Sequence, residues 1–283
     1  MAAQEPEQLE ASLMQAGLAD DGHFDAVRAA LLLAALDRPD VSLQPYEEHL
    51  AELGAAARGF LKKVTDLPVN LAASALADLV ADRFGYHGDE QTYDDMQNAN
   101  LMRVIDRRRG LPVSLGLIYL HAARALGLDL SGLDFPGHFV MRLQGRGGMA
   151  IMDPFNRGRT LDARDLLELL RRANGNDAKL TPETYAPVSD RDVVLRLQNN
   201  ILGRALGAGD PARACTVLSR MIMIAPAKPE LRFELGRLEV HAGHLSAAAE
   251  AFTACIGLCH EQENVRMSAM AADALIRLKA RLH

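Results

Sequence analysis

Residues 195–224 read LRLQNNILGRALGAGDPARACTVLSRMIMI, and residues 229–258 read PELRFELGRLEVHAGHLSAAAEAFTACIGL. The two stretches match at an offset of 34 residues. Six positions agree in character: Leu197 with Leu231, Ile201 with Leu235, Gly209 with Gly243, Ala214 with Ala248, Leu218 with Phe252 and Met221 with Cys255. Small and apolar residues that recur at one fixed offset indicate a repeated structural unit that packs on its own copy.

A period of 34 residues is typical of tetratricopeptide repeats, in which a pair of antiparallel helices forms one unit. Ala214 and Ala248 fall where the two helices of a unit must approach closely, and Gly209 and Gly243 fall in the turn between them. We therefore expect an α-α superhelical tetratricopeptide module over residues 190–283.

This module is short, because only two full units fit before the end of the sequence. Pro226 stands where the second helix of the first unit should end, and residues 264–282 predict a helix that caps the stack. Each unit buries its apolar face only against its neighbours, so two units need such a cap. The alternative is a pair of ordinary helical hairpins that agree by chance.

Length and composition restrict the remaining possibilities. A chain of 283 residues favours two domains, and 49% hydrophobic with 24% charged residues is typical of a soluble globular protein. The net charge of −6 argues against a nucleic-acid partner, because phosphate binding needs a cationic face. Apolar stretches such as residues 29–36 are much shorter than the ~20 residues that span a bilayer. We expect a cytoplasmic protein with no membrane contact.

The three cysteines do not suggest a disulfide framework, since their number is odd and a reducing cytoplasm fits them. Cys255, Cys259 and the adjacent His260 raise the possibility of a metal site. A structural zinc site needs a second pair of ligands, which the sequence lacks. We therefore expect no metal and no cofactor, and we interpret the thiols as small buried hydrophobes.

The first two thirds of the chain read as a flexible leader over residues 1–20, a domain over residues 21–180 and a linker that follows it. Apolar periodicity and flanking Pro or Gly predict helices over residues 24–36, 46–63, 71–84, 112–126 and 161–173. Residues 139–143 and 149–153 predict a β-hairpin around the Gly-rich turn at residues 145–148. The predicted fold class is mostly α, with a small antiparallel sheet.

Three motifs in this domain occur together: NANLMRVIDRRRGLPVSLGLIYLHAARALGL at residues 98–128, PGHF at residues 136–139 and DPF at residues 153–155. They resemble the bacterial SirB-type family, in which a transglutaminase-like domain precedes tetratricopeptide repeats. The resemblance covers about residues 31–170. It implies a helical transglutaminase-like domain with a small antiparallel sheet. The resemblance also agrees with the repeats predicted downstream.

The resemblance also implies three site residues. In transglutaminase-like enzymes a nucleophilic Cys begins a helix, a His follows on the first strand of a small sheet, and an Asp on the next strand orients it. Ser114, His138 and Asp153 match these positions. A helix N-terminus and an imidazolium stabilise a thiolate, whereas a serine hydroxyl gains far less and needs near-ideal geometry and an oxyanion hole. Serine in place of cysteine therefore weakens the catalytic interpretation.

Each of these residues also has a purely structural interpretation. Ser114 can satisfy a free backbone N–H in the first helical turn. His138 and Asp153 can form a buried polar pair that needs no substrate, and Asp153 before Pro154 can shape a turn. His121 lies on the same helix face as Ser114, and we interpret it as a packed core residue.

The run Arg107–Arg109 is the most cationic stretch of the domain. Guanidinium groups match carboxylates and phosphates, so an anionic ligand is one interpretation. The other is a solvated surface, salt-bridged to the acidic loop at residues 89–95.

Our leading hypothesis is a non-catalytic or residual transglutaminase-like protein that acts as a protein-interaction adaptor or regulator. Its partner is expected to be a protein or peptide that binds the helical repeats. The alternative is a serine-dependent amide or ester hydrolase or acyltransferase that uses Ser114, His138 and Asp153 as a triad. A purely structural scaffold is the third hypothesis.

Overall fold

The computed structural model describes residues 5–60 and 64–280, which form two compact units. Among the described residues, the first unit contains residues 5–9 and 21–197, and the second contains residues 10–20 and 198–280. Helices dominate both, and one small antiparallel sheet lies in the first, which confirms the predicted fold class. Among the described residues of both units, no helix combines the length and apolar character that crossing a bilayer requires.

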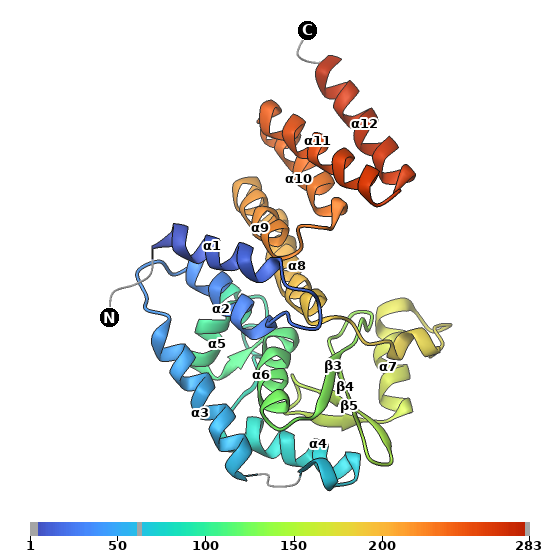
Figure 1. Cartoon of the computed structure of the whole chain (residues 1–283). Coiled ribbons are helices and arrows are strands. Elements are labelled where there is room, and N and C mark those ends of the chain that lie inside the picture. The colour runs from blue at the N-terminus through green and yellow to red at the C-terminus, as the bar shows by residue number, and fades with distance from the viewer. Residues whose placement is uncertain (1–4, 61–63, 281–283) are drawn as a thin grey trace. The chain divides into compact units, whose positions relative to one another are not determined.

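The first unit begins with helices and continues into the sheet (Figure 1). Its helices are α2 (Ala26–Leu36), α3 (Gln44–Phe60), α4 (Val69–Ala77), α5 (Leu101–Arg107), α6 (Pro112–Ala125) and α7 (Ala163–Asn174). All the helices predicted for this domain are present, and their boundaries differ by a few residues wherever they are described; the end predicted at residue 63 lies outside the described residues. The predicted third helix consists of two types, because α4 continues as a π-helix over Asp78–Arg83. Gly85, with φ of +76°, follows its end.

Helix α6 is the centre of this unit. Pro112 occupies its first turn, where a missing N–H removes no helical hydrogen bond. Both Leu115 and Ile118 are fully buried, and the side chains on every face of the helix up to Leu120 are buried as well. A helix that is apolar all round must be enclosed by other elements, which makes α6 a fixed support for the side chains that it carries.

The sheet has four antiparallel strands in the order β3-β4-β5-β6. They are β3 (Asp129–Gly132), β4 (Met141–Gly145), β5 (Gly148–Asp153) and β6 (Arg159–Leu161). The predicted hairpin is β4–β5, with Met141 opposite Met152 and the turn at Gly145–Gly148. Helices α4 and α6 contact the sheet (Figure 1). A separate two-residue parallel ladder joins β1 (His87–Gly88) to β2 (Arg109–Gly110).

Residues 6–17 correct the expected flexible leader, because they form helix α1 (Pro6–Gly17). Leu13 in this helix is fully buried. A Cβ atom on Gly17 would lie 1.9 Å from the carbonyl oxygen of Met223, so the end of α1 packs directly on the backbone of α9 (Pro211–Ile224). The part of the leader at residues 1–4 lies outside the described residues.

The second unit is the repeat module together with residues 10–20. Helix α8 (Asp190–Gly207) leads into it, and α9, α10 (Pro229–Ala242), α11 (Leu245–Glu261) and α12 (Val265–Ala280) complete it. Gly209 and Gly243 adopt left-handed backbone conformations in the inter-helix turns, with φ of +68° and +84°. Ala214 and Ala248 are fully buried at the close approaches, as the 34-residue period predicts.

The predicted cap is α12, and the end predicted at residue 282 lies outside the described residues. Its Leu278 is buried in a cluster with Ala248 and Phe252 of α11. On α11, Cys255 and Cys259 are buried together with Ala271 of α12. Burial raises the pKa of Cys255 to about 12, so this thiol stays protonated and packs as an apolar group.

Candidate functional site

Ser114 is the third residue of α6 and is fully buried. Its Oγ donates a hydrogen bond to the backbone carbonyl oxygen of Asn98, at 2.7 Å. The same carbonyl accepts the backbone N–H of Leu111, which precedes the helix. Ser114 therefore ties the start of α6 to the turn at Met96–Ala99, and its hydroxyl does not cap a backbone N–H as the structural interpretation supposed.

His138 and Asp153 lie side by side, since His138 Nε2 is 2.9 Å from Asp153 Oδ2. Asp153 is the last residue of β5, as the family pattern implies. His138 differs from that pattern, because it lies in a turn before β4 instead of on a strand. Within residues 5–60 and 64–280, the hydrogen bonds of Ser114 and His138 do not join the two side chains.

Asp153 is almost completely buried and accepts several hydrogen bonds. The backbone N–H of Phe155 donates to Oδ1 at 2.9 Å, and the side chain of Asn156 donates to Oδ2 at 2.6 Å. Burial by itself raises the pKa of Asp153, but the contacts with His138 and Asn156 outweigh it and hold this pKa below its ordinary value. Asp153 thus both orients His138 and shapes the turn after β5.

A glycine brings the two halves of this site together. A Cβ atom on Gly116 would lie 2.4 Å from Cε1 of Phe139, so the face of α6 next to Ser114 touches the residue that follows His138. No larger residue fits there without moving the aromatic ring. The structure therefore brings the helix of Ser114 and the turn of His138 into contact, although it directs the Ser114 hydroxyl to Asn98.

Arg196, in the first part of α8, holds the turn that carries His138. Its guanidinium donates to the carbonyl oxygens of Phe135, at 2.9 Å, and His138, at 3.0 Å. It also lies 5.6 Å from the centroid of the Phe139 ring. Burial lowers the pKa of Arg196. The sequence offers no sign of this role, because Arg196 follows His138 by 58 residues.

We expect Arg196→Met to lower the free energy of unfolding by about 2 kcal/mol, since hydrogen bonds from charged donors contribute roughly 1.5–3 kcal/mol. The imidazole NMR signals of His138 should shift, because both carbonyl contacts of its turn are lost. Arg237→Met, at an exposed position of α10, is the control and should change stability by less than ~0.5 kcal/mol. Equal stability and unchanged His138 signals in both variants would contradict this role.

The arginine run divides between half-buried and exposed positions. Arg107 forms an ion pair with Asp89 and donates to the side chain of Asn98 at 2.9 Å. Asp89 is only 2% exposed, so the predicted pairing with the acidic loop exists but is buried instead of solvated. Arg108 lies over the Tyr86 ring. Arg109 is exposed.

Arg107 and Ser114 are connected through Asn98. Asn98 receives Arg107 on its side-chain oxygen and Ser114 on its backbone oxygen, so both side chains converge on one residue. Burial by itself raises the pKa of Asp89, but hydrogen bonds from Thr92 and Arg107 outweigh it and hold this pKa well below the ordinary carboxyl range. The region next to Ser114 is therefore a closed polar network.

A shallow cavity of about 370 Å³ lies beside this network, lined by residues that include His87, Arg109, Phe155 and Asn156. It reaches Asn156, the partner of Asp153, but Ser114 and His138 do not line it. Across residues 5–60 and 64–280, no three His, Cys, Asp or Glu side chains are grouped so that they could hold a metal ion.

Comparisons with known proteins agree with this architecture. Residues 44–199 match the model of the transglutaminase-like superfamily, and residues 201–277 match a tetratricopeptide repeat model. A UPF0162 protein of Xylella fastidiosa (strain 9a5c) is 31% identical over 251 residues, 88% of this chain and 89% of that protein. A UPF0162 protein of Vibrio cholerae is 32% identical over 62% of this chain and 66% of its own length.

Among solved structures, a crystal structure of menin covers 97% of this chain and 70% of the menin chain, at 12% identity and a TM-score of 0.43. That score is too low to indicate a common fold. The sequence matches, in contrast, cover both units and include the residues that form the Ser114 and His138 regions. This chain belongs to the transglutaminase-like superfamily, in the bacterial SirB-type group of UPF0162 proteins that carry tetratricopeptide repeats after that domain.

Proposed function

We propose that this protein is a non-catalytic member of the transglutaminase-like superfamily that acts as an adaptor or regulator by binding a protein or peptide through its repeats. One observation carries the non-catalytic part. Ser114 is fully buried and donates its hydroxyl proton to the carbonyl oxygen of Asn98. Three buried cysteines without a disulfide fit the cytoplasmic location that we propose with it.

A nucleophilic hydroxyl needs a substrate carbonyl within reach and a base that accepts its proton. The hydroxyl of Ser114 faces a backbone carbonyl that cannot take up a proton at neutral pH. Replacing the contact with Asn98 by a contact with His138 would also leave that carbonyl with one partner fewer. The arrangement therefore favours a structural hydroxyl that connects the start of α6 to the preceding turn.

The adaptor part rests on the repeat module. Tetratricopeptide repeats stack into surfaces that bind extended peptides or helices, and this module carries two units and a capping helix. Substitution of arginines on the first helices of the units, such as half-buried Arg204→Glu and exposed Arg237→Glu, should weaken a captured protein partner. A partner that binds both variants as tightly as the wild type, as measured by co-purification, would remove support for this surface.

A serine-dependent amide or ester hydrolase or acyltransferase is the second candidate. The observation in its favour is the contact between His138 and Asp153, at 2.9 Å, because a base oriented by a carboxylate is half of a triad. In that case Ser114 would have to turn from Asn98 toward His138 and become accessible.

Labelling distinguishes the two candidates. We expect a fluorophosphonate to leave Ser114 unlabelled. We also expect the thiol introduced by Ser114→Cys to react with iodoacetamide as slowly as the buried Cys255, because neither is accessible in the folded protein. Peptide mass spectrometry follows each thiol separately.

The opposite outcome is equally clear. A thiol at this position that reacts faster than a small free thiol at pH 7 would indicate a thiolate stabilised by the helix terminus and His138. Fluorophosphonate labelling of the wild type that disappears in Ser114→Ala would identify a nucleophilic serine. Either result would replace the adaptor proposal with the enzyme.

A further inference from the structure

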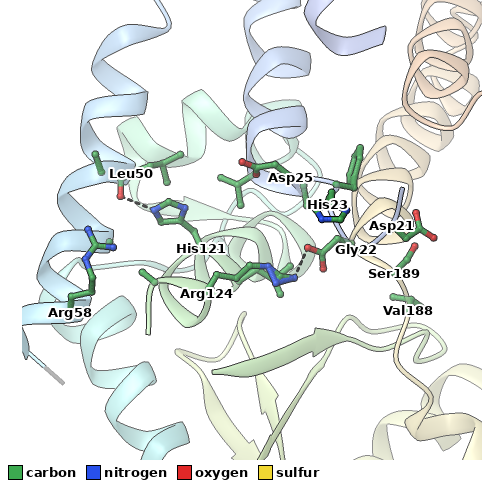
Figure 2. Close-up of a pocket in the computed structure, with 18 residues that line it drawn as sticks. Asp21, Gly22, His23, Asp25, Leu50, Arg58, His121, Arg124, Val188 and Ser189 are labelled. Atoms are coloured by element: carbon green, nitrogen blue, oxygen red, sulfur yellow. Dashed lines mark hydrogen bonds and ion pairs between the residues drawn. The ribbon is translucent and has the colours of Figure 1, made fainter. Parts of the chain in front are cut away.

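The first unit contains a cavity of about 910 Å³ at the opposite end of α6 from Ser114. Helices α3 and α6 form two of its walls, and the starts of α2 and α8 with the residues before them form the rest. Figure 2 shows Arg58 and His121 toward one end, and Asp21, Gly22 and His23 toward the other. Its volume is in the range of cavities that bind small molecules.

Apolar side chains make up much of the lining. Val27 comes from α2, Leu50 from α3, and Leu120 and Ala125 from α6. The loop before α2 adds Phe24. A ligand that fills this space must therefore bring an apolar body, since burial of apolar surface is the main favourable contribution that such a lining offers.

The acidic side chains of the lining already have partners. Asp21 pairs with Arg191 at 2.8 Å, and Asp190 pairs with Arg124. Asp25 is the N-cap of α2 and accepts the backbone N–H of Arg28 at 2.9 Å. These carboxylates do not need a cation from a ligand.

Arg58 differs from these residues. Its side chain is exposed, and within residues 5–60 and 64–280 its guanidinium has no ion pair and no hydrogen bond. A Cβ atom built on Gly54 would lie 3.6 Å from Nη1 of Arg58 and 3.4 Å from Nε2 of His121. Both nitrogens therefore lie next to the same point on α3, where the glycine leaves the wall without a side chain.

His121 is held in place at this point. Its Nε2 lies 2.7 Å from the carbonyl oxygen of Leu50, so this nitrogen carries the proton and donates it. The hydrogen bond fixes the imidazole, which lines the same end of the cavity as Arg58 (Figure 2). The sequence predicts a packed core residue at His121, whereas the structure places it half-buried at the edge of a cavity.

We infer that this cavity binds a small monocarboxylic acid with an aliphatic body, with its carboxylate on Arg58 and its chain against Val27 and Leu120. The planar guanidinium of arginine matches a carboxylate with two parallel hydrogen bonds. Arg58 offers one guanidinium and the rest of the space is largely apolar, so a second carboxylate would be buried without a partner, which favours a monoanion over a dianion. This inference does not depend on the function of Ser114.

Calorimetric titration of the full chain with sodium octanoate tests the inference. Octanoate should bind, whereas acetate, which lacks the chain, and 1-octanol, which lacks the charge, should bind at least about tenfold more weakly. Arg58→Gln should weaken octanoate at least about tenfold, because a charge-assisted contact is lost. The control Arg103→Gln removes an exposed arginine of α5 that does not line the cavity, and it should bind octanoate like the wild type.

A second variant tests the space instead of the charge. Gly54→Leu should abolish octanoate binding while it retains Arg58, because the new side chain enters the cavity and its Cβ meets only ordinary contacts. Thermal unfolding verifies that the variant is folded. The inference is overturned if octanoate does not bind the wild type at millimolar concentration, if Arg58→Gln binds it equally well, or if octanol binds as tightly as octanoate.

Discussion

Arg107→Met should lower the free energy of unfolding by about 3–5 kcal/mol at pH 7, because it leaves the charge of Asp89 buried without its partner. For a chain of this size the midpoint of thermal unfolding should fall by roughly 10 °C. The side chain of Asn98 also loses its donor from Arg107, so the turn that receives the Ser114 hydroxyl should loosen. Differential scanning calorimetry measures both the midpoint and the enthalpy.

The same variant has a predictable pH dependence. In the wild type the pKa of Asp89 is lower in the folded state than in the unfolded state. Its contribution to the free energy of unfolding is therefore complete above about pH 4 and is lost as the pH falls through the folded pKa. In Arg107→Met the buried charge is costly at neutral pH and is relieved when Asp89 is protonated. The difference in stability between the two proteins should therefore be greatest near pH 7 and should narrow below about pH 4.

Arg109→Met supplies the matched control for this prediction. Arg109 is two residues farther along, exposed, and without an ion pair in the part of the chain that the structure describes. Its replacement should change stability by less than ~0.5 kcal/mol at every pH. Equal effects of the two substitutions would show that the contact between Arg107 and Asp89 contributes little, and the closed network beside Ser114 would lose its main support.

Gly116→Val should destabilise the protein by about 3 kcal/mol, the upper part of the usual range for overpacking a core. The Cβ atom alone would lie 2.4 Å from the Phe139 ring, and both residues are enclosed, so the ring cannot move into solvent. The displaced ring carries His138 with it. Chemical denaturation gives the stability, and the His138 NMR signals report the displacement.

Gly203→Ala is the control, at a helix glycine that no other side chain packs against. Gly203 is exposed in α8, and no atom outside its own stretch of helix lies within 4 Å of the position of its missing Cβ. Alanine there should stabilise the protein by roughly 0.5–1 kcal/mol, because glycine is a poor helix former. Opposite signs for the two glycines would confirm that Gly116 is required by tertiary contact. A stabilising Gly116→Val would show that α6 and the His138 turn are not in contact.

These predictions separate two properties of the Ser114 region. Kinship to the transglutaminase-like superfamily follows from the family match over residues 44–199, and His138 and Asp153, two of the three residues proposed for its site, are in contact. The chemical role depends on where the Ser114 hydroxyl points, and it points to Asn98. A family pattern identifies which residues occupy a site, whereas the proton and its acceptor are set by the surrounding network.

The sequence by itself determined the features that depend on neighbours along the chain. The 34-residue period predicted the helix pairs and the turns at Gly209 and Gly243, and Pro112 marked the start of α6. These signals are local, because helix periodicity, turns and caps involve residues within about four positions of each other. Family motifs added the three residues of the candidate site.

Only the tertiary structure decided the contacts between distant segments. The hydroxyl of Ser114 reaches Asn98, Arg196 reaches the carbonyl of His138 across 58 residues, and Gly17 of an unpredicted helix meets Met223. Local propensity carries no information about such partners, because they depend on the path of the whole chain and on how closely packed segments exclude one another. For the same reason, the cavity beside Arg58 could not be predicted from the sequence, because it forms where α3 and α6 pack together.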